Sequence, residues 1–162
     1  MRHIISVLVE NKFGVLSRIS GLFSGRGYNI ESLSVAETVD SAISRMTIIT
    51  KGNDRVIEQI TKHLNKLIDV IKVIDHAEEK YVSRELALLK INSEPSNRDE
   101  ILRIVQIFRG KIIDMSPKTY TVEVTGTEEK IDAFIEMVKP LGIKEIARTG
   151  VVAMSRGSKS LT

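Results

Sequence analysis

The order of strand-like and helix-like segments in this chain occurs twice, and this repeat limits the possible folds more than any other feature. Short apolar runs with branched residues are typical of buried strands, whereas apolar residues at helical spacing indicate amphipathic helices. Each half of the chain has the order strand, helix, strand, strand, helix, strand. This is the split βαββαβ unit of ferredoxin-like domains. The sequence therefore predicts an α+β protein with two tandem ferredoxin-like domains.

The first half is predicted to end at residue 76, and the second to begin at residue 83. In the first half we expect strands at 4–9, 30–36, 43–50 and 70–74, with helices at 14–24 and 53–67. In the second half we expect strands at 86–91, 112–115, 120–125 and 143–154, with helices starting after Ser96 and at Thr127. The charged residues near 75–80 have no apolar periodicity, which is typical of a connection. The predicted domains are therefore 1–76 and 83–162, joined by a linker at 77–82.

Domains of this size bury small cores, which makes oligomerisation a common source of added stability. Two helices cover only one face of each predicted sheet. The apolar residues Val7, Val9, Leu33 and Val35 are candidates for the open face or a sheet edge. The basic tail from Ser155 to Ser160 has the composition of a frayed, solvated end.

Composition argues against several classes of function. The chain has no cysteine, and its three histidines lack the spacing of metal ligands, so we expect no metal site. No nucleophile or acid–base motif is present, which argues against an enzyme. Aromatic residues make up only 4% of the chain, too few for the base-stacking surface of RNA-binding relatives of this fold. Lys and Arg alternate with Asp and Glu, so no basic patch for nucleic acid is expected.

The same features favour a cytoplasmic protein. No apolar run approaches the roughly 20 residues that span a bilayer, and the first residues do not resemble a signal peptide. The absence of cysteine agrees with a reducing compartment.

The junction between the first strand and the first helix is the best candidate for a ligand site. Asn11 and Gly14 lie where the strand ends and the helix begins. A helix start offers unpaired N–H groups at the positive end of the helix dipole, and glycine lets an anion approach the backbone closely. Asn29 and Ile30 open the next strand after the helix stop at Gly25 and Gly27. The alternative is purely structural: Gly14 relieves a tight turn and Asn11 caps the helix.

Five segments of the chain resemble one known family. They are residues 10–18 (ENKFGVLSR), 21–33 (GLFSGRGYNIESL), 44–47 (SRMT), 108–114 (FRGKIID) and 147–157 (ARTGVVAMSRG). These segments are similar to the regulatory (small) subunit of acetolactate synthase, also called acetohydroxyacid synthase, and the likeness covers essentially the whole chain. The resemblance implies an N-terminal ACT domain, a small amino-acid-binding module, followed by a C-terminal ferredoxin-like domain.

The resemblance also implies a function and partners. The partner is the catalytic large subunit, a transferase that carries thiamine diphosphate, Mg²⁺ and FAD and condenses two pyruvates to acetolactate, or pyruvate with 2-oxobutyrate. This chain would hold no cofactor, would activate the large subunit, and would confer feedback inhibition by valine in branched-chain amino-acid biosynthesis. In such subunits ACT domains pair as a homodimer with valine at their interface.

These implications give each candidate residue a role. The valine carboxylate is expected on the backbone amides of Gly14, Val15 and Leu16, with Asn11 beside it. Asn29 and Ile30 of the neighbouring subunit would meet the ammonium group. The isopropyl group would enter a recess lined by Leu16, Ile30 and Val35. The other possibilities are a stand-alone ACT-type amino-acid sensor that acts on another protein, and an enzyme in its own right.

Overall fold

The computed structural model describes residues 1–161, which form two compact units. The first unit is Met1–Val82 together with the segment from Val151 onward, and the second is Ser83–Gly150. Both units are ferredoxin-like, as the repeated order of segments predicts. None of the helices within residues 1–161 is long and apolar enough to cross a membrane.

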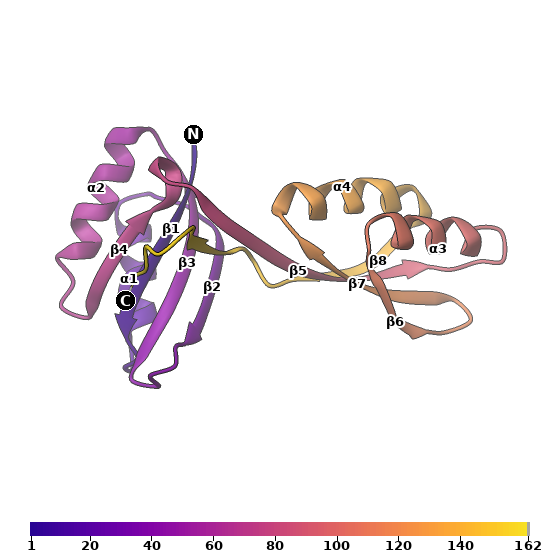
Figure 1. Cartoon of the computed structure of the whole chain (residues 1–162), viewed down its shortest axis with the longest axis horizontal. Coiled ribbons are helices and arrows are strands. Elements are labelled where there is room, and N and C mark those ends of the chain that lie inside the picture. The colour runs from indigo at the N-terminus through magenta and orange to yellow at the C-terminus, as the bar shows by residue number, and fades with distance from the viewer. Residues whose placement is uncertain (162) are drawn as a thin grey trace. The chain divides into compact units, whose positions relative to one another are not determined.

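The first unit contains a four-stranded antiparallel sheet and two α-helices (Figure 1). Its elements are β1 (Arg2–Glu10), α1 (Val15–Gly25), β2 (Ile30–Glu37), β3 (Ile43–Lys51), α2 (Asp54–Asn65) and β4 (Val70–Asp75). The strand order is β2-β3-β1-β4, so β2 and β4 are the two edges. At the start of α2, the side chain of Asn53 accepts a hydrogen bond of 2.9 Å from the N–H of Val56, the usual role of an N-cap.

The two helices pack on the face of the sheet that carries the odd-numbered residues of β1. Ile5, Val7 and Val9 are each at most 1% exposed and share one core with residues of α1 and α2. Leu33 packs against the same core. The expectation of an open face or a sheet edge is therefore wrong for Val7 and Val9, because strand alternation turns them toward the helices in a central strand. Leu33 lies on edge strand β2, with its side chain toward the helices. Val35, at 41% exposure, does lie at the surface of edge strand β2.

The opposite face of the first sheet is covered by the C-terminal end of the chain. The short strand β9 (Val152–Ser155) pairs with the start of β5, and Leu161 is buried against Leu8 and Ile74. Residues 156–160 are exposed, as expected of a solvated end, but the end at 155–160 is not frayed, because Ser155 is buried and Lys159 pairs with Glu79. The composition of residues 155–160 is that of a solvated end, but Leu161, which follows them, packs against apolar residues of a sheet that is distant in sequence.

The second unit repeats the arrangement with a different sheet edge. Its elements are β5 (Tyr81–Asn92), α3 (Arg98–Ile107), β6 (Lys111–Met115), β7 (Thr119–Gly126), α4 (Glu128–Val138) and β8 (Ile143–Arg148), with strand order β6-β7-β5-β8. Both helices bury their apolar residues on one face of this sheet. There the rings of Phe108 and Phe134 pack edge to face, with their centroids 5.4 Å apart. The side chain of Thr127 caps α4, as its position before the helix predicts.

The boundaries of the units differ from the predicted domains 1–76 and 83–162. The predicted long strand at 143–154 is divided into β8 and β9 by Gly150, which has a φ of 80° that suits glycine. Everything from Val151 onward therefore lies in the first unit, apart from Thr162, which is outside the described residues. The predicted linker at 77–82 overlaps a short 3₁₀ helix (His76–Glu78) and the first residues of β5.

Candidate functional site

The start of α1 is open. Gly14 occupies the N-cap with a left-handed φ of 82°, and no side chain caps the helix. The N–H of Val15 reaches the carbonyl of Lys12 at 3.4 Å, whereas the N–H groups of Leu16 and Ser17 find no acceptor among residues 1–161. The first turn contains no acidic residue. Free N–H groups and the helix dipole therefore favour a small anion at this end.

The side chain of Asn11 does not cap α1. Its amide nitrogen donates to Glu37 Oε1 at 3.0 Å and to the carbonyl of Ser41 at 2.8 Å, and its backbone N–H donates to the carbonyl of Ala42 at 2.7 Å. Both side-chain N–H groups are therefore used within the chain. The remaining group, Oδ1, is an acceptor and suits an ammonium group rather than a carboxylate.

Two ion pairs flank the start of the helix. Arg18 holds the buried Asp69 through Nη2 at 2.7 Å and Nε at 2.9 Å. Lys12 pairs with Glu10 at 2.8 Å, and this hydrogen bond raises the pKa of the Lys12 ammonium group. A side chain at position 14 would place its Cβ 3.0 Å from Arg18 Nη1. Arg18 therefore lies over the position where Gly14 leaves the backbone exposed.

The other four predicted residues do not lie together. Val15 and Leu16 are near Asn11, whereas Asn29 and Ile30 are at the opposite end of the sheet. Val15 is 3% exposed, so only its backbone is available, while Leu16 is 44% exposed beside it. Ile30 pairs with Thr50, which in turn pairs with His3 near the start of β1. Asn11 follows the other end of β1, so roughly 25–30 Å of strand separates it from Asn29 and Ile30. One copy of the chain therefore does not bring all six residues together.

Asn29 and Ile30 occupy an edge of the first sheet. The side chain of Asn29 is exposed, and its carbonyl accepts a hydrogen bond of 2.7 Å from the buried Thr50 hydroxyl. Ile30 is half-buried against the core and begins edge strand β2. Both residues are thus accessible along an edge that no other strand of the described chain occupies.

Sequence reasoning missed four residues of this region: Glu37, Ser41, Arg18 and Asp69. For Arg18 a local signal existed, because position i+4 on a helix lies over position i, here Gly14. Glu37 ends β2, Ser41 lies in the turn from β2 to β3, and Asp69 immediately precedes β4. The pairing of β2 with β3 and of β1 with β3 and β4 brings them to Asn11 and Arg18.

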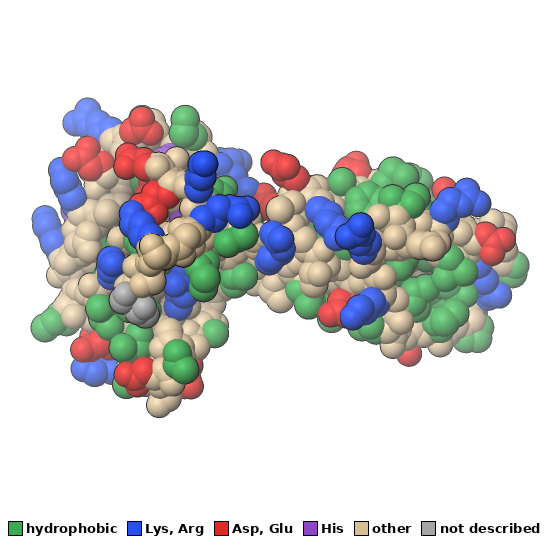
Figure 2. Space-filling view, viewed as in Figure 1, with side chains coloured by type: hydrophobic (Ala, Val, Ile, Leu, Met, Phe, Trp, Pro, Cys, Tyr) green, Lys and Arg blue, Asp and Glu red, His purple; other side chains and the backbone are tan. Residues whose placement is uncertain are grey.

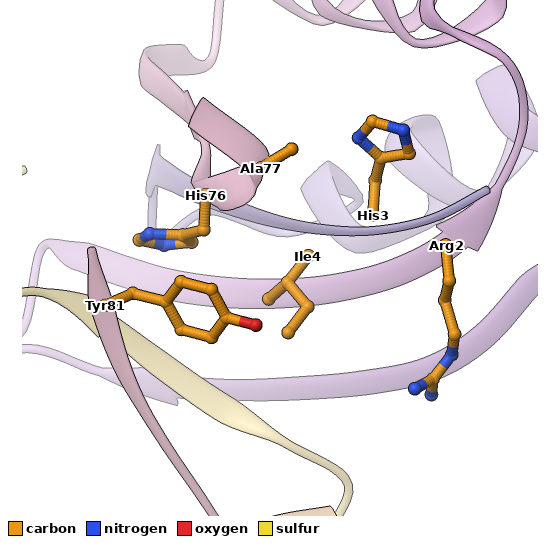
Figure 3. Close-up of a pocket in the computed structure, with 6 residues that line it drawn as sticks. All are labelled: Arg2, His3, Ile4, His76, Ala77 and Tyr81. Atoms are coloured by element: carbon orange, nitrogen blue, oxygen red, sulfur yellow. The ribbon is translucent and has the colours of Figure 1, made fainter. Parts of the chain in front are cut away.

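A separate cavity of about 140 Å³ lies at the opposite end of β1 (Figure 3). Its lining residues are Arg2, His3, Ile4, His76, Ala77 and Tyr81. His3 and Ile4 project to opposite sides of β1, and His3 is held by Asp75 at 3.0 Å. None of the six predicted site residues lines this cavity.

Charged side chains are mixed across the visible face of the first unit (Figure 2). Blue Lys and Arg side chains stand beside red Asp and Glu side chains, as the alternation in the sequence predicts. Within residues 1–161, no group of three or more His, Asp or Glu residues could hold a metal ion.

Two family models match the chain and divide it as the two sheets do. Residues 5–72 match the AHAS small subunit-like ACT domain, and residues 84–157 match the small subunit of acetolactate synthase. A probable acetolactate synthase small subunit of Methanothermobacter thermautotrophicus is 58% identical over 160 residues, covering 98% of this chain and 95% of that protein. This chain belongs to the acetolactate synthase small-subunit family.

Further relatives extend the likeness to bacteria and to a crystal structure. The small subunit of acetolactate synthase isozyme 3 of Escherichia coli is 52% identical, covering 98% of both chains. The crystal structure of the Thermotoga maritima small subunit is 43% identical and has a TM-score of 0.90, covering 98% of this chain and 99% of that one. The resemblance seen in the sequence is thereby confirmed. The chain is a small, regulatory subunit of acetolactate synthase, with an ACT-type first domain and a ferredoxin-like second domain.

Proposed function

We propose that this chain activates a catalytic acetolactate synthase subunit in the cytoplasm and makes it sensitive to valine. The catalytic subunit, with its thiamine diphosphate, Mg²⁺ and FAD, converts two pyruvates to 2-acetolactate and CO₂, and this chain adds regulation without chemistry of its own. The observation that carries the valine proposal is the open start of α1, with glycine in place of a capping side chain.

The donors and acceptors at this start support one orientation for the amino acid. Its carboxylate docks on the free N–H groups at Leu16 and Ser17, close to the backbone of Gly14 and Val15. Its ammonium group faces Oδ1 of Asn11, whose own N–H groups are committed to neighbouring residues. In this orientation Asn11 contacts the ammonium group of valine, and not the carboxylate as expected from the sequence.

A second copy of the chain would complete the site. Strand β2 is a free edge running from Ile30 to Glu37, so two copies related by a twofold axis can pair these edges in antiparallel fashion. Such pairing puts the partner's Ile30 opposite Glu37, which holds Asn11. Asn29 and Ile30 of the second copy thus approach the amino acid bound by the first. The exposed Leu16 and Val35 are then available to line the recess for its side chain.

The energetics fit a modestly selective regulatory site. Burying an isopropyl group contributes ~1.5–3 kcal/mol. Discrimination by one methylene is worth ~1–3 kcal/mol, so weaker responses to leucine and isoleucine are expected. Inhibition requires a coupling of ~1–3 kcal/mol between this site and the catalytic subunit.

The proposal is tested by assaying acetolactate formation by the catalytic subunit alone, with this chain, and with this chain plus valine. We expect higher activity on adding the chain and inhibition by valine only when the chain is present. Calorimetry of valine with the chain alone is measured in parallel. Binding of valine without any effect on the catalytic subunit would instead favour a stand-alone amino-acid sensor, and the absence of both would reject the proposal.

A further inference from the structure

The segment from Val151 to Leu161, here called the C-terminal strap, is an integral part of the first unit. It crosses the face of the sheet opposite α1 and α2 and appears in yellow beside β1 and β3 (Figure 1). Its inward residues Val151, Ala153, Ser155 and Leu161 are at most 9% exposed, whereas Val152 and Met154 are more than half exposed. This alternation identifies one face of the strap as a packing surface.

A buried polar network fixes the middle of the strap. The carbonyl of Ala153 accepts hydrogen bonds from Arg45 Nη2 at 2.7 Å and from Ser6 Oγ at 3.4 Å. Ser6 is completely buried, and its hydroxyl lies 2.8 Å from Nε2 of His76. Arg45 and Ser6 would lose this acceptor if the strap left the sheet, and buried polar groups without partners are costly. Specific hydrogen bonds therefore attach the strap to this face of the sheet.

Other contacts hold the two ends of the strap. Ser155 Oγ donates to Glu79 at 3.2 Å, and Lys159 forms an ion pair with the same carboxylate. The N–H of Val151 donates to Ser32 Oγ at 3.4 Å. The N–H of Arg156 donates to the carbonyl of Lys80 at 2.9 Å. The strap is thus attached along its whole length.

The far end of the strap reaches the back of the candidate effector site. Leu161 is 4% exposed and forms a small cluster with Leu8 and Ile74, against which Ile43 packs. Ile43 is the first residue of β3, pairs with Glu10, and directly follows Ala42. The carbonyl of Ala42 accepts the N–H of Asn11. Leu161 therefore supports the strand ends that present Asn11.

We propose that the C-terminal strap is a coupling element whose docking strengthens effector binding at Asn11 and Gly14. Both sites contact the end of β1 and the start of β3: Leu161 packs with Leu8 and Ile43, and Asn11 donates to the carbonyl of Ala42. Thermodynamic linkage then makes the effect reciprocal: the amino acid holds the strap in place by the same factor by which the strap raises affinity. This inference rests on the proposed function, because it takes valine as the effector.

The first test is made on the full-length wild-type chain and needs no substitution. Amide hydrogen exchange of residues 151–161 is measured with and without saturating valine, after calorimetry establishes that valine binds. We expect amide exchange in the strap to slow at least five-fold, which is about the lower limit of typical allosteric coupling. Binding of valine with unchanged exchange would overturn the coupling. Absence of valine binding would instead reject the proposed function.

The second test compares two substitutions within the strap. Leu161→Ser removes the inward contact, and Met154→Ser changes an outward side chain that is 58% exposed. We expect Leu161→Ser to weaken valine binding at least five-fold and Met154→Ser to leave it unchanged. Circular dichroism establishes that both variants are folded. Equal valine affinity in the wild type and in a folded Leu161→Ser variant would contradict the proposal.

Discussion

Gly14 is the residue at which backbone conformation and ligand chemistry meet. Its left-handed φ favours glycine, and the absence of a side chain leaves the start of α1 open below Arg18. A carboxylate placed here by mutation would occupy the position proposed for the carboxylate of valine and would pair with the free N–H groups and with Arg18.

We therefore expect Gly14→Asp to abolish valine inhibition while activation of the catalytic subunit is retained. Acetolactate assays over a range of valine concentrations provide the measurement. Gly21→Asp is the matched control, because Gly21 lies within α1 and an added Cβ there meets open space. Full valine inhibition of the Gly14→Asp complex would place the effector elsewhere.

Asn11 combines two roles, and Asn11→Ala removes the groups that serve both. Its nitrogen links β1 to Glu37 and Ser41, whereas its oxygen is left for the ligand. We expect Asn11→Ala to weaken valine binding by ~1–3 kcal/mol, the cost of leaving a buried polar partner unpaired. Calorimetry measures the affinity, and thermal unfolding checks that the loop is intact. Unchanged affinity would remove Asn11 from the site.

At the scale of elements, the second sheet contains a buried and an exposed ion pair that can be compared. Glu85 on β5 is 4% exposed and accepts from Arg148 Nη2 on β8 at 3.0 Å. Glu145 on β8 is 71% exposed and lies 3.5 Å from Lys90 on β5. The two pairs join the same strands but differ in burial and in bonding, because Arg148 makes two hydrogen bonds to Glu85 and also pairs with Asp132.

We expect Glu85→Gln to lower the free energy of unfolding by ~1–3 kcal/mol, because it weakens a charge-assisted pair inside the sheet. Glu145→Gln should change it by about 0.5 kcal/mol or less, as is usual for exposed pairs. Urea denaturation of the full chain measures both. Equal effects would mean that the buried pair with two hydrogen bonds contributes no more to stability than the exposed pair.

The 3₁₀ helix after β4 contains a buried histidine, His76. Burial lowers the pKa of the His76 imidazole, and the positive charge of Arg45 is the second cause. The carboxylates of Glu79 and Asp75 act to raise this pKa, and the charge of Lys159 acts to lower it. A histidine whose pKa is lowered by folding binds a proton more readily when unfolded. Its contribution to stability is therefore complete above the ordinary pKa of about 6.5 and declines as the pH falls below it.

We expect the urea midpoint of the wild type to fall between pH 7.5 and 5.5 more steeply than that of His76→Gln. The amide of glutamine offers both an N–H donor and a carbonyl acceptor to Ser6 and does not titrate. Parallel pH profiles for the two proteins would show that His76 is not responsible.

At the scale of the whole molecule, a site shared between two copies makes binding and association one equilibrium. If valine binds only to the paired form, a concentration near 100 times its Kd adds ~2.7 kcal/mol of dimer stability per site. We expect sedimentation equilibrium to report a lower dimer dissociation constant with valine and an unchanged one for Gly14→Asp. Valine binding with no change in the wild-type dimer would place the complete site within one chain.

Much of this protein could be deduced without tertiary information. The repeated strand and helix periodicities specify two ferredoxin-like units, because burial of one face dictates the spacing of apolar residues in each element. Gly14 and the helix start at Val15 were also accessible, since glycine and helix-start patterns are local. The start of α3 was harder to predict from the sequence, because Ser96 resembles a cap but Asn97 occupies the N-cap.

Tertiary structure alone decided which distant groups meet. Pairing of β1 with β3 brings Ser41 and Ala42 to Asn11 and so determines that Asn11 offers an acceptor. The turn at Gly150 sends Ala153 back to Arg45 on the first sheet, although the sequence of the tail resembles a solvated end. Local sequence encodes backbone preference and the period of burial, whereas these contacts depend on complementary surfaces brought together from residues far apart in the chain.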